Sequence, residues 1–216
     1  MAIINSIILG RAKGSIGNVS FSTQKGRVIA RQKPSIVANP RTQAQLDQRA
    51  KVSAVNVAWY MIGNVIKSGI TQLVGYGSQF NTYVSKNADV FAGKEFTKET
   101  FKTMDLVGSF ASVGANPKLP FTLVTQDIST LEVSFNKNTF GLYAKVGDIL
   151  KVVAGKDLAS EQSYSEVAVT QAMLDQIVPT AVFQDLDLQG LGDTIAALWL
   201  ESADGKISST SQFEVI

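Results

Sequence analysis

Two carboxylates stand at a spacing that can bind a metal ion. Asp185 and Asp187 flank a single leucine, and in an extended chain alternate side chains point to the same side. Paired carboxylate oxygens of this kind can hold Ca²⁺ or Mg²⁺, which prefer oxygen ligands. No further cluster of oxygen ligands follows them in the sequence, so solvated loop acids are the simpler interpretation. We therefore predict no metal site.

Two glycine-containing segments resemble parts of nucleotide-binding motifs. Gly75 and Gly77 begin like a dinucleotide fingerprint, but Phe80 stands where the third glycine belongs. Gly155 and Lys156 lack both the earlier glycine and the following serine or threonine of a phosphate-binding loop. We interpret both segments as turns.

The composition removes most catalytic chemistry. The 216 residues include no cysteine and no histidine. Without cysteine there is no disulfide framework, thiolate metal site or cysteine nucleophile, and without histidine the commonest general base and metal ligand are missing. We predict that the protein is not an enzyme, has no catalytic residues and uses no cofactor. Its 45% apolar and 18% charged composition is typical of a folded globular chain.

No segment has the pattern of a secretory signal or a membrane span. Residues 1–9 are apolar, but no basic residue precedes them and no convincing cleavage site follows, so we interpret them as a strand. Residues 52–62 are the nearest approach to a membrane span, which needs about 20 apolar residues. We predict no membrane partner, and a chain that is used in a cytoplasm or in a particle assembled there.

Charge is distributed unevenly along the chain. Residues 1–51 hold nine basic side chains and one acidic side chain, whereas the remainder holds eleven basic and seventeen acidic ones. The two parts therefore carry about +8 and −6, which favours a chain that meets copies of itself, or an acidic partner, head to tail. The nine basic residues are Arg11, Lys13, Lys25, Arg27, Arg31, Lys33, Arg41, Arg49 and Lys51.

Residues 1–41 have the pattern of a basic β arm. Val19, Phe21 and Thr23 alternate with serines, and Val28 and Ala30 continue the alternation after a glycine. Two antiparallel strands are the simplest prediction. Such a hairpin is too small to be stable alone and has an open edge on each side. It therefore needs a partner surface, either in its own chain or in another.

Residues 42–116 predict a helical region with a connector. Thr42 and Gln45 have the spacing of a capping box, so a helix begins there. Beyond residue 52 this helix is apolar on most of its circumference, with Trp59, Ile62 and Ile66 on its second face. That face is covered either within the chain's own fold or by another subunit. A second helix is expected over 78–89.

Residues 117–216 read as short strands separated by turn residues. Asp204-Gly205 is a strong signal for a hairpin turn, and a helical turn over 171–177 is expected to join two strands. We predict an α+β protein with an N-terminal β-hairpin arm, a helical middle segment and a C-terminal antiparallel immunoglobulin-like β-sandwich. The expected strands span 121–124, 131–135, 149–153, 165–170, 181–183, 194–201 and 207–216.

Residues 10–51 carry a specific combination of motifs. In order, it consists of "G-x-x-G-N-V", a basic strand, and "N-P-R-T-x-A-Q" at a helix start. With these motifs the chain resembles an uncharacterised family encoded by gut Bacteroidetes and by their tailed phages, including crAss-like phages. The resemblance implies a phage or phage-derived structural protein and brings no established catalytic residues. The motifs are Gly14-Ser15-Ile16-Gly17-Asn18-Val19, Gly26-Arg27-Val28-Ile29-Ala30-Arg31 and Asn39-Pro40-Arg41-Thr42-Gln43-Ala44-Gln45.

These observations together predict a non-enzymatic structural protein of a tailed-phage virion, such as a ring, connector or capsid-associated component. It would assemble in the host bacterial cytoplasm with copies of itself and other virion proteins. The arm would add strands to an adjacent copy, and the apolar helix would form part of the contact. The predicted interface residues are Arg11, Lys13, Phe21, Arg27, Val28, Arg31, Lys33, Trp59, Ile62 and Ile66.

Two other functions are open from the sequence. The basic segment could contact nucleic acid as part of an accessory protein, although only Phe21 is available there to stack on a base. The predicted sandwich could instead bind a receptor or carbohydrate on a particle surface, by analogy with other sandwich domains. Its only tryptophan, Trp199, lies in a densely apolar strand and is expected in the core.

Overall fold

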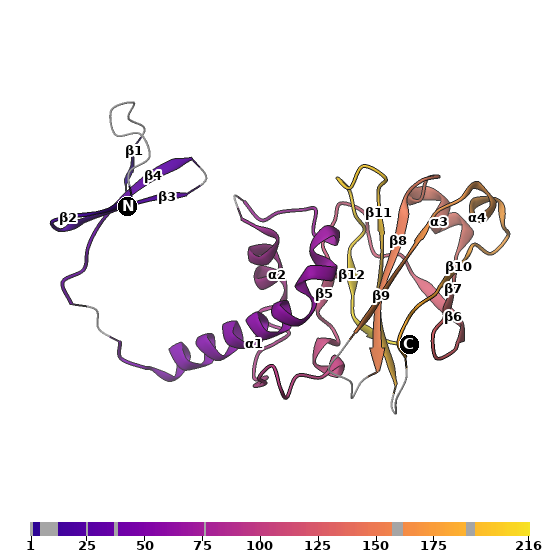
Figure 1. Ribbon diagram of the computed structural model, residues 1–216, viewed down its shortest axis with the longest axis horizontal. Coiled ribbons are helices and arrows are strands. Elements are labelled where there is room, and N and C mark those ends of the chain that lie inside the picture. The colour runs from indigo at the N-terminus through magenta and orange to yellow at the C-terminus, as the bar shows by residue number, and fades with distance from the viewer. Residues whose placement is uncertain are drawn as a thin grey trace. The chain divides into compact units, whose positions relative to one another are not determined.

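A computed structural model describes residues 2–4, 13–24, 26–36, 39–75, 77–156, 162–188 and 193–216. The chain forms two compact units, which we call unit 1 (Met1–Thr42) and unit 2 (Gln43–Ile216). The boundary lies one residue from the predicted end of the β arm. Each unit is shown in Figure 1.

Unit 1 is an antiparallel sheet of four strands in the order β1-β4-β3-β2. The central strands β3 (Val19–Gln24) and β4 (Arg27–Gln32) form the predicted hairpin. Gly26 has a φ of 79° in the turn between them, a value that glycine adopts without strain. The outer strands β1 (Ala2–Ile4) and β2 (Gly14–Ile16) each pair three residues with the hairpin. β1 lies within residues 1–9, which we interpreted as a strand, whereas β2 was not predicted.

Unit 2 begins with helices. Helix α1 (Gln43–Ile66) continues into the 3-10 turn η1 (Lys67–Gly69). Helix α2 (Gln79–Asn87) follows, and the Ser78 hydroxyl caps it by accepting the backbone N–H of Asn81 at 3.3 Å. A second 3-10 turn, η2 (Thr103–Leu106), precedes β5 (Phe110–Ser112). No helix in the described ranges, α1 included, combines the length and apolarity needed to cross a membrane.

Two antiparallel sheets make up the C-terminal half. One has the order β10-β7-β6, from β6 (Phe121–Gln126), β7 (Leu131–Phe135) and β10 (Thr180–Phe183). The other has the order β13-β11-β8-β9, from β8 (Ile149–Lys156), β9 (Ser163–Ala168), β11 (Thr194–Glu201) and β13 (Glu214–Val215). Side chains of both sheets, including Val133, Phe183 and Leu198, share one hydrophobic cluster. This is the arrangement of a β-sandwich.

Three shorter elements complete unit 2. Helix α3 (Lys137–Tyr143), which the sequence did not predict, connects the two sheets and is capped by the Asn136 side chain. Helix α4 (Gln171–Asp175) lies within the helical turn predicted over 171–177, and Thr170 caps it, because its hydroxyl accepts the Met173 N–H at 3.3 Å. Strand β12 (Ser211–Gln212) pairs with β5.

The central strands β8 and β11 are covered on both faces. Leu198 faces the sandwich cluster, whereas Ile195 and Trp199 of the same strand join a second cluster with Ile62 of α1. In Figure 1, helices α1 and α2 and the β10-β7-β6 sheet lie on opposite sides of β8 and β11. The sequence placed a boundary between helical and sandwich domains at residues 116 and 117. The structure has one compact unit there, because the helices and the sheet share a core.

Candidate interaction surface

The unit 1 sheet has an apolar face. Residues paired across an antiparallel ladder point to the same side, and the register pairs Ile16 with Val19, Phe21 with Ala30, and Val28 with Thr23. The apolar face is therefore formed by Ile16, Val19, Phe21, Val28 and Ala30. Val28 is buried, whereas Ile16 is 77% exposed and Val19 is 37% exposed. A row of apolar side chains thus reaches the surface at the β2 edge.

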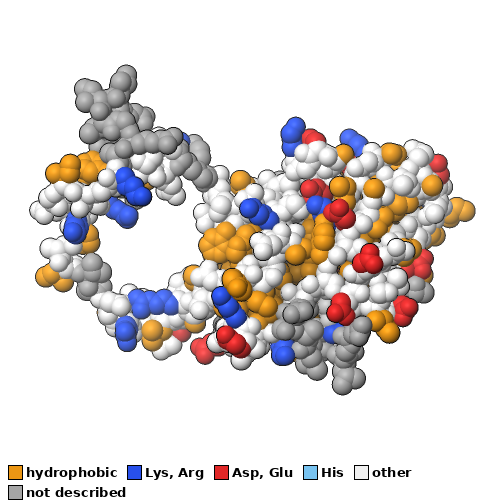
Figure 2. All heavy atoms as spheres, viewed as in Figure 1, with side chains coloured by type: hydrophobic (Ala, Val, Ile, Leu, Met, Phe, Trp, Pro, Cys, Tyr) orange, Lys and Arg blue, Asp and Glu red, His pale blue; other side chains and the backbone are white. Residues whose placement is uncertain are grey.

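The opposite face of the same sheet is basic. On β4, Arg27 and Arg31 point away from the apolar face and have Gln24 and Ser20 as cross-strand partners, and the half-buried Ile29 lies between them on the same side. Lys33 extends this face, because its N–H donates to the Asn18 carbonyl at 2.6 Å and continues the ladder. The basic face is therefore defined by Arg27, Arg31 and Lys33, all of which are exposed. Figure 2 shows blue Lys and Arg side chains and no red acidic ones over unit 1.

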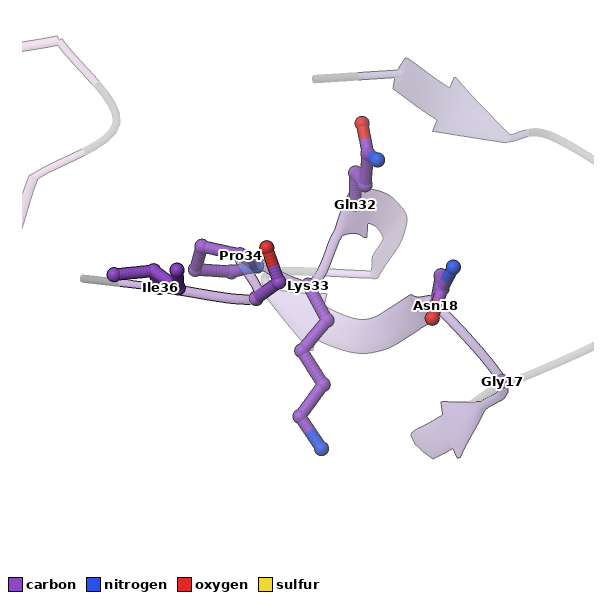
Figure 3. Close-up of a pocket in the computed structure, with 7 residues that line it drawn as sticks. Gly17, Asn18, Gln32, Lys33, Pro34 and Ile36 are labelled. Atoms are coloured by element: carbon purple, nitrogen blue, oxygen red, sulfur yellow. The ribbon is translucent and has the colours of Figure 1, made fainter.

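A shallow pocket lies where β4 ends. It has a volume of about 700 Å³ and is lined by Gly17, Asn18 and residues 32–36. In Figure 3 the Gln32 and Lys33 side chains point to opposite sides of the chain, as strand alternation requires. Polar groups dominate the walls, although Ile36 is highly exposed beside them. The pocket therefore lies beside the basic face and offers no enclosed apolar cavity.

The sheet also has an open edge at β4. Strand β1 pairs only with the segment from Val28 to Ala30, so β4 continues past it through Arg31 and Gln32. Within the described residues, no strand pairs with those two positions on that side. Lys13 lies one residue before β2 and is exposed, but no ladder pair fixes its direction. Arg11 lies outside the described residues.

The structure does not support two of the predicted interface residues on α1. Ile62 and Ile66 are buried in the second hydrophobic cluster of their own chain, so they cannot contact another subunit in this fold. Trp59 is half-buried, with ring centroids 5.7 Å from Phe80 and 5.2 Å from Tyr83. The correction has a simple cause: the second apolar face of α1 is covered within unit 2 by the sheet and α2.

The predicted helix start agrees with the structure in position. α1 begins at Gln43, so Thr42 occupies the position before its first turn. The Gln43 side chain donates to the Asp47 carboxylate one turn later at 2.7 Å. The reciprocal capping bonds of Thr42 and Gln45 stay a prediction.

One buried ionic cluster escaped the sequence analysis. Lys151 on β8 lies 2.9 Å from the Glu201 carboxylate on β11, and its ammonium donates to the Ser68 hydroxyl at 3.1 Å. On β9, burial raises the pKa of Tyr164 above its ordinary value, and the nearby Glu166 carboxylate adds to the effect. A lysine within an otherwise apolar strand was the available signal. Because Glu201 pairs with the ammonium, we interpret the cluster as a link between η1 and the sheet.

The segment that holds Asp185 and Asp187 is not a regular extended strand, because Asp185 has a φ of 59°. Both are exposed, while the intervening Leu186 and the following Leu188 are buried. The Leu186 N–H donates to the Ser129 carbonyl at 3.0 Å, which ties the segment to the neighbouring turn. In the described part of the chain, no group of three or more acidic side chains could hold a metal ion.

Comparison with known proteins gives one match. Residues 11–116 match the model of a family described as a family of unknown function, DUF6266. The matched region includes most of unit 1 together with α1, α2 and β5, and it stops before the sandwich strands. No curated protein and no solved structure matches the chain significantly.

Proposed function

We propose that this protein is a non-enzymatic structural component of a tailed-phage virion, where it assembles through unit 1. The observation that carries the proposal is the amphipathic, single-layer sheet of unit 1. Positions such as a ring, a connector or a capsid-associated layer place many copies of one chain side by side, and assembly in such sites is symmetric. The phage setting is supported by the motif resemblance over residues 10–51.

The apolar face of unit 1 provides the physical reason for assembly. A sheet with one apolar face is normally covered by a second layer. Ile16 and Val19 are exposed on that face, and the described residues of unit 1 form a single sheet. An adjacent copy can supply the missing layer, or can add a strand along the open β4 edge. The arm residues Phe21 and Val28 would then lie at the subunit contact.

Unit 2 would serve as the body of the particle subunit. We propose that its sandwich is immunoglobulin-like, and the strand order supports this. In chain order, the first, second and fifth of the seven strands (β6, β7, β10) form one sheet, and the other four form the second. This division corresponds to the A-B-E and C-F-G grouping of immunoglobulin-like domains, with one additional strand beside C.

Native mass measurement tests the assembly proposal. We expect the full chain to form a symmetric oligomer, and we expect a variant lacking residues 1–34 to be a folded monomer, because unit 2 has its own core. The double substitution Ile16→Ser/Phe21→Ser should weaken association in the same way. Ile128→Ser, which removes an exposed apolar side chain from unit 2, is the matched control and should leave association unchanged. A full chain that stays monomeric at high concentration would contradict the proposal.

A further inference from the structure

We propose that the basic face of unit 1 binds the phosphate backbone of nucleic acid, without reading its sequence. This goes beyond assembly, because the basic face and the apolar face are opposite sides of one sheet. The apolar face can therefore contact protein while the basic face contacts a polyanion. The two activities depend on different residues and can be tested separately.

The arrangement of the cations is the first argument. Arg27 and Arg31 lie on one face of β4, Lys33 directly follows the strand on the same side, and all three are exposed. At about 3.3 Å per residue they cover about 20 Å of β4, a length over which duplex DNA presents roughly a dozen negative charges. Serine side chains of the neighbouring strand β3 share the face, and the Ser20 hydroxyl donates to the Arg31 carbonyl at 3.3 Å. The face therefore presents cations and small polar groups around one half-buried isoleucine, Ile29, and carries no acidic side chain.

The charges of the two units indicate whether the basic face is better suited to bind nucleic acid or the acidic surface of a protein. Residues 1–42 contain seven basic and no acidic side chains, whereas residues 43–216 contain thirteen basic and eighteen acidic ones. Several acids of unit 2 are already paired with lysines, including Glu201 with Lys151 and Glu214 with Lys118. The surface of unit 2 in a second copy therefore has charges of both signs and only a weak negative electrostatic potential. A nucleic acid offers a uniform negative field that matches an acid-free sheet.

The position of Phe21 indicates that binding does not read bases. Phe21 is the only aromatic residue in the sequence of unit 1. Its cross-strand partner is Ala30, so its ring lies on the apolar face and points away from the face that carries Arg31. Sequence-tolerant stacking of bases needs aromatic rings on the binding surface. The basic face supplies phosphate contacts only, so affinity should depend on salt and not on sequence.

Fluorescence anisotropy of the full chain with labelled duplex DNA tests the inference. Two unrelated 30-base-pair duplexes are titrated at several salt concentrations. We expect equal affinity for both, and a plot of log K against log salt with a slope of about −2.7 or steeper, since three phosphate contacts each contribute about −0.9. The triple variant Arg27→Gln/Arg31→Gln/Lys33→Gln should lose at least tenfold in affinity at low salt, and its slope should be shallower by about 2.7.

A charge-matched control separates this face from net charge. Lys67→Gln/Lys86→Gln/Lys145→Gln removes three exposed cations from unit 2 and should leave both affinity and slope nearly unchanged. Circular dichroism confirms that both triple variants stay folded. Equal losses in the two triple variants, or no salt-dependent binding by the unmodified chain, would overturn the inference. Competition by poly-glutamate that equals competition by DNA at the same charge concentration would also overturn it, and would favour an acidic protein surface.

Discussion

The two units of this chain use their apolar residues differently. In unit 2, large side chains such as Trp199, Tyr83 and Phe101 are completely buried, and strands β8 and β11 are covered on both faces. In unit 1, Val28 is buried, whereas Ile16 on the same face is 77% exposed. Unit 2 is therefore built to be stable by itself, whereas the surface of unit 1 is suited to contact another molecule.

Charge follows the same division. The buried pair of Lys151 and Glu201 in unit 2 is held between strands and serves the fold. The basic residues of the unit 1 face are exposed to solvent, where a single charge adds little to folding stability. The three cations therefore contribute more to the charge of one exposed face than to the stability of the fold. Location relative to the core, and not residue type, therefore separates the charged side chains that support the fold from those for which we propose a binding role.

Ile62→Ala should give the largest loss of stability. Ile62 is buried between α1 and the sheet, so truncation leaves a cavity and lowers the free energy of unfolding by about 2–5 kcal/mol. Urea denaturation of the full chain measures the change. Ile16→Ala is the matched control, and we expect less than about 0.5 kcal/mol there because the side chain is exposed. If Ile62→Ala changed the oligomeric state while leaving stability intact, its assignment to the core would be wrong.

Glu201→Gln should have the next largest effect. The substitution leaves the buried Lys151 ammonium without its partner at 2.9 Å, which typically costs about 3–5 kcal/mol. We expect about 3 kcal/mol, since the Glu166 carboxylate lies 4.0 Å away and glutamine still accepts a hydrogen bond. Thermal and urea unfolding measure the loss.

The corresponding change in unit 1 sharpens the contrast. Arg31→Gln removes an exposed charge and should change stability by less than about 0.5 kcal/mol. Replacing both members of the buried pair, as Lys151→Met/Glu201→Leu, should recover most of the loss in Glu201→Gln, because no unpaired buried charge is left. If Glu201→Gln and Arg31→Gln changed the free energy of unfolding by similar amounts, the charged residues of the two units would not differ in their contribution to folding stability.

Local patterns predicted many elements of the fold. The alternation at Leu131, Val133 and Phe135 predicted β7 with correct bounds, and the run over 194–201 predicted β11. Asp204-Gly205 lies in the predicted turn, where the Gly205 φ is 67° and the Ser202 N–H donates to the Ile207 carbonyl at 2.8 Å. These strands and this turn are determined by residues that lie close together in the sequence, so local patterns are sufficient to predict them.

Features that depend on distant residues could not be predicted in the same way. An apolar second face on α1 indicates only that something covers Ile62 and Ile66. Whether their cover comes from the same chain depends on β8 and β11, which follow α1 by more than 80 residues. The alternation of side chains along β4 indicated that the strand has two different faces. Which residues of β3 share each of these faces depends on the pairing of β3 with β4, which the structure provides. The three-residue strand β2 has too short a pattern to be predicted, and the apolar pattern of residues 1–9 indicated a strand without showing that it pairs with β4.

The stability of unit 2 should also decrease at alkaline pH, because its core holds the buried Tyr83. Burial raises the pKa of Tyr83 well above 10, an effect that the nearby Ser109 side chain partly opposes. In the unfolded chain this phenol ionises near pH 10, so stability present below pH 10 is lost as the pH rises toward the folded pKa. One such tyrosine accounts for about 1.4 kcal/mol between pH 9 and pH 11. Urea denaturation at these two pH values should therefore show a smaller loss for Tyr83→Phe than for the unmodified chain. Equal losses would mean that Tyr83 ionises as readily in the folded protein, and the closed core of unit 2 around α1 and α2 would have to be reconsidered.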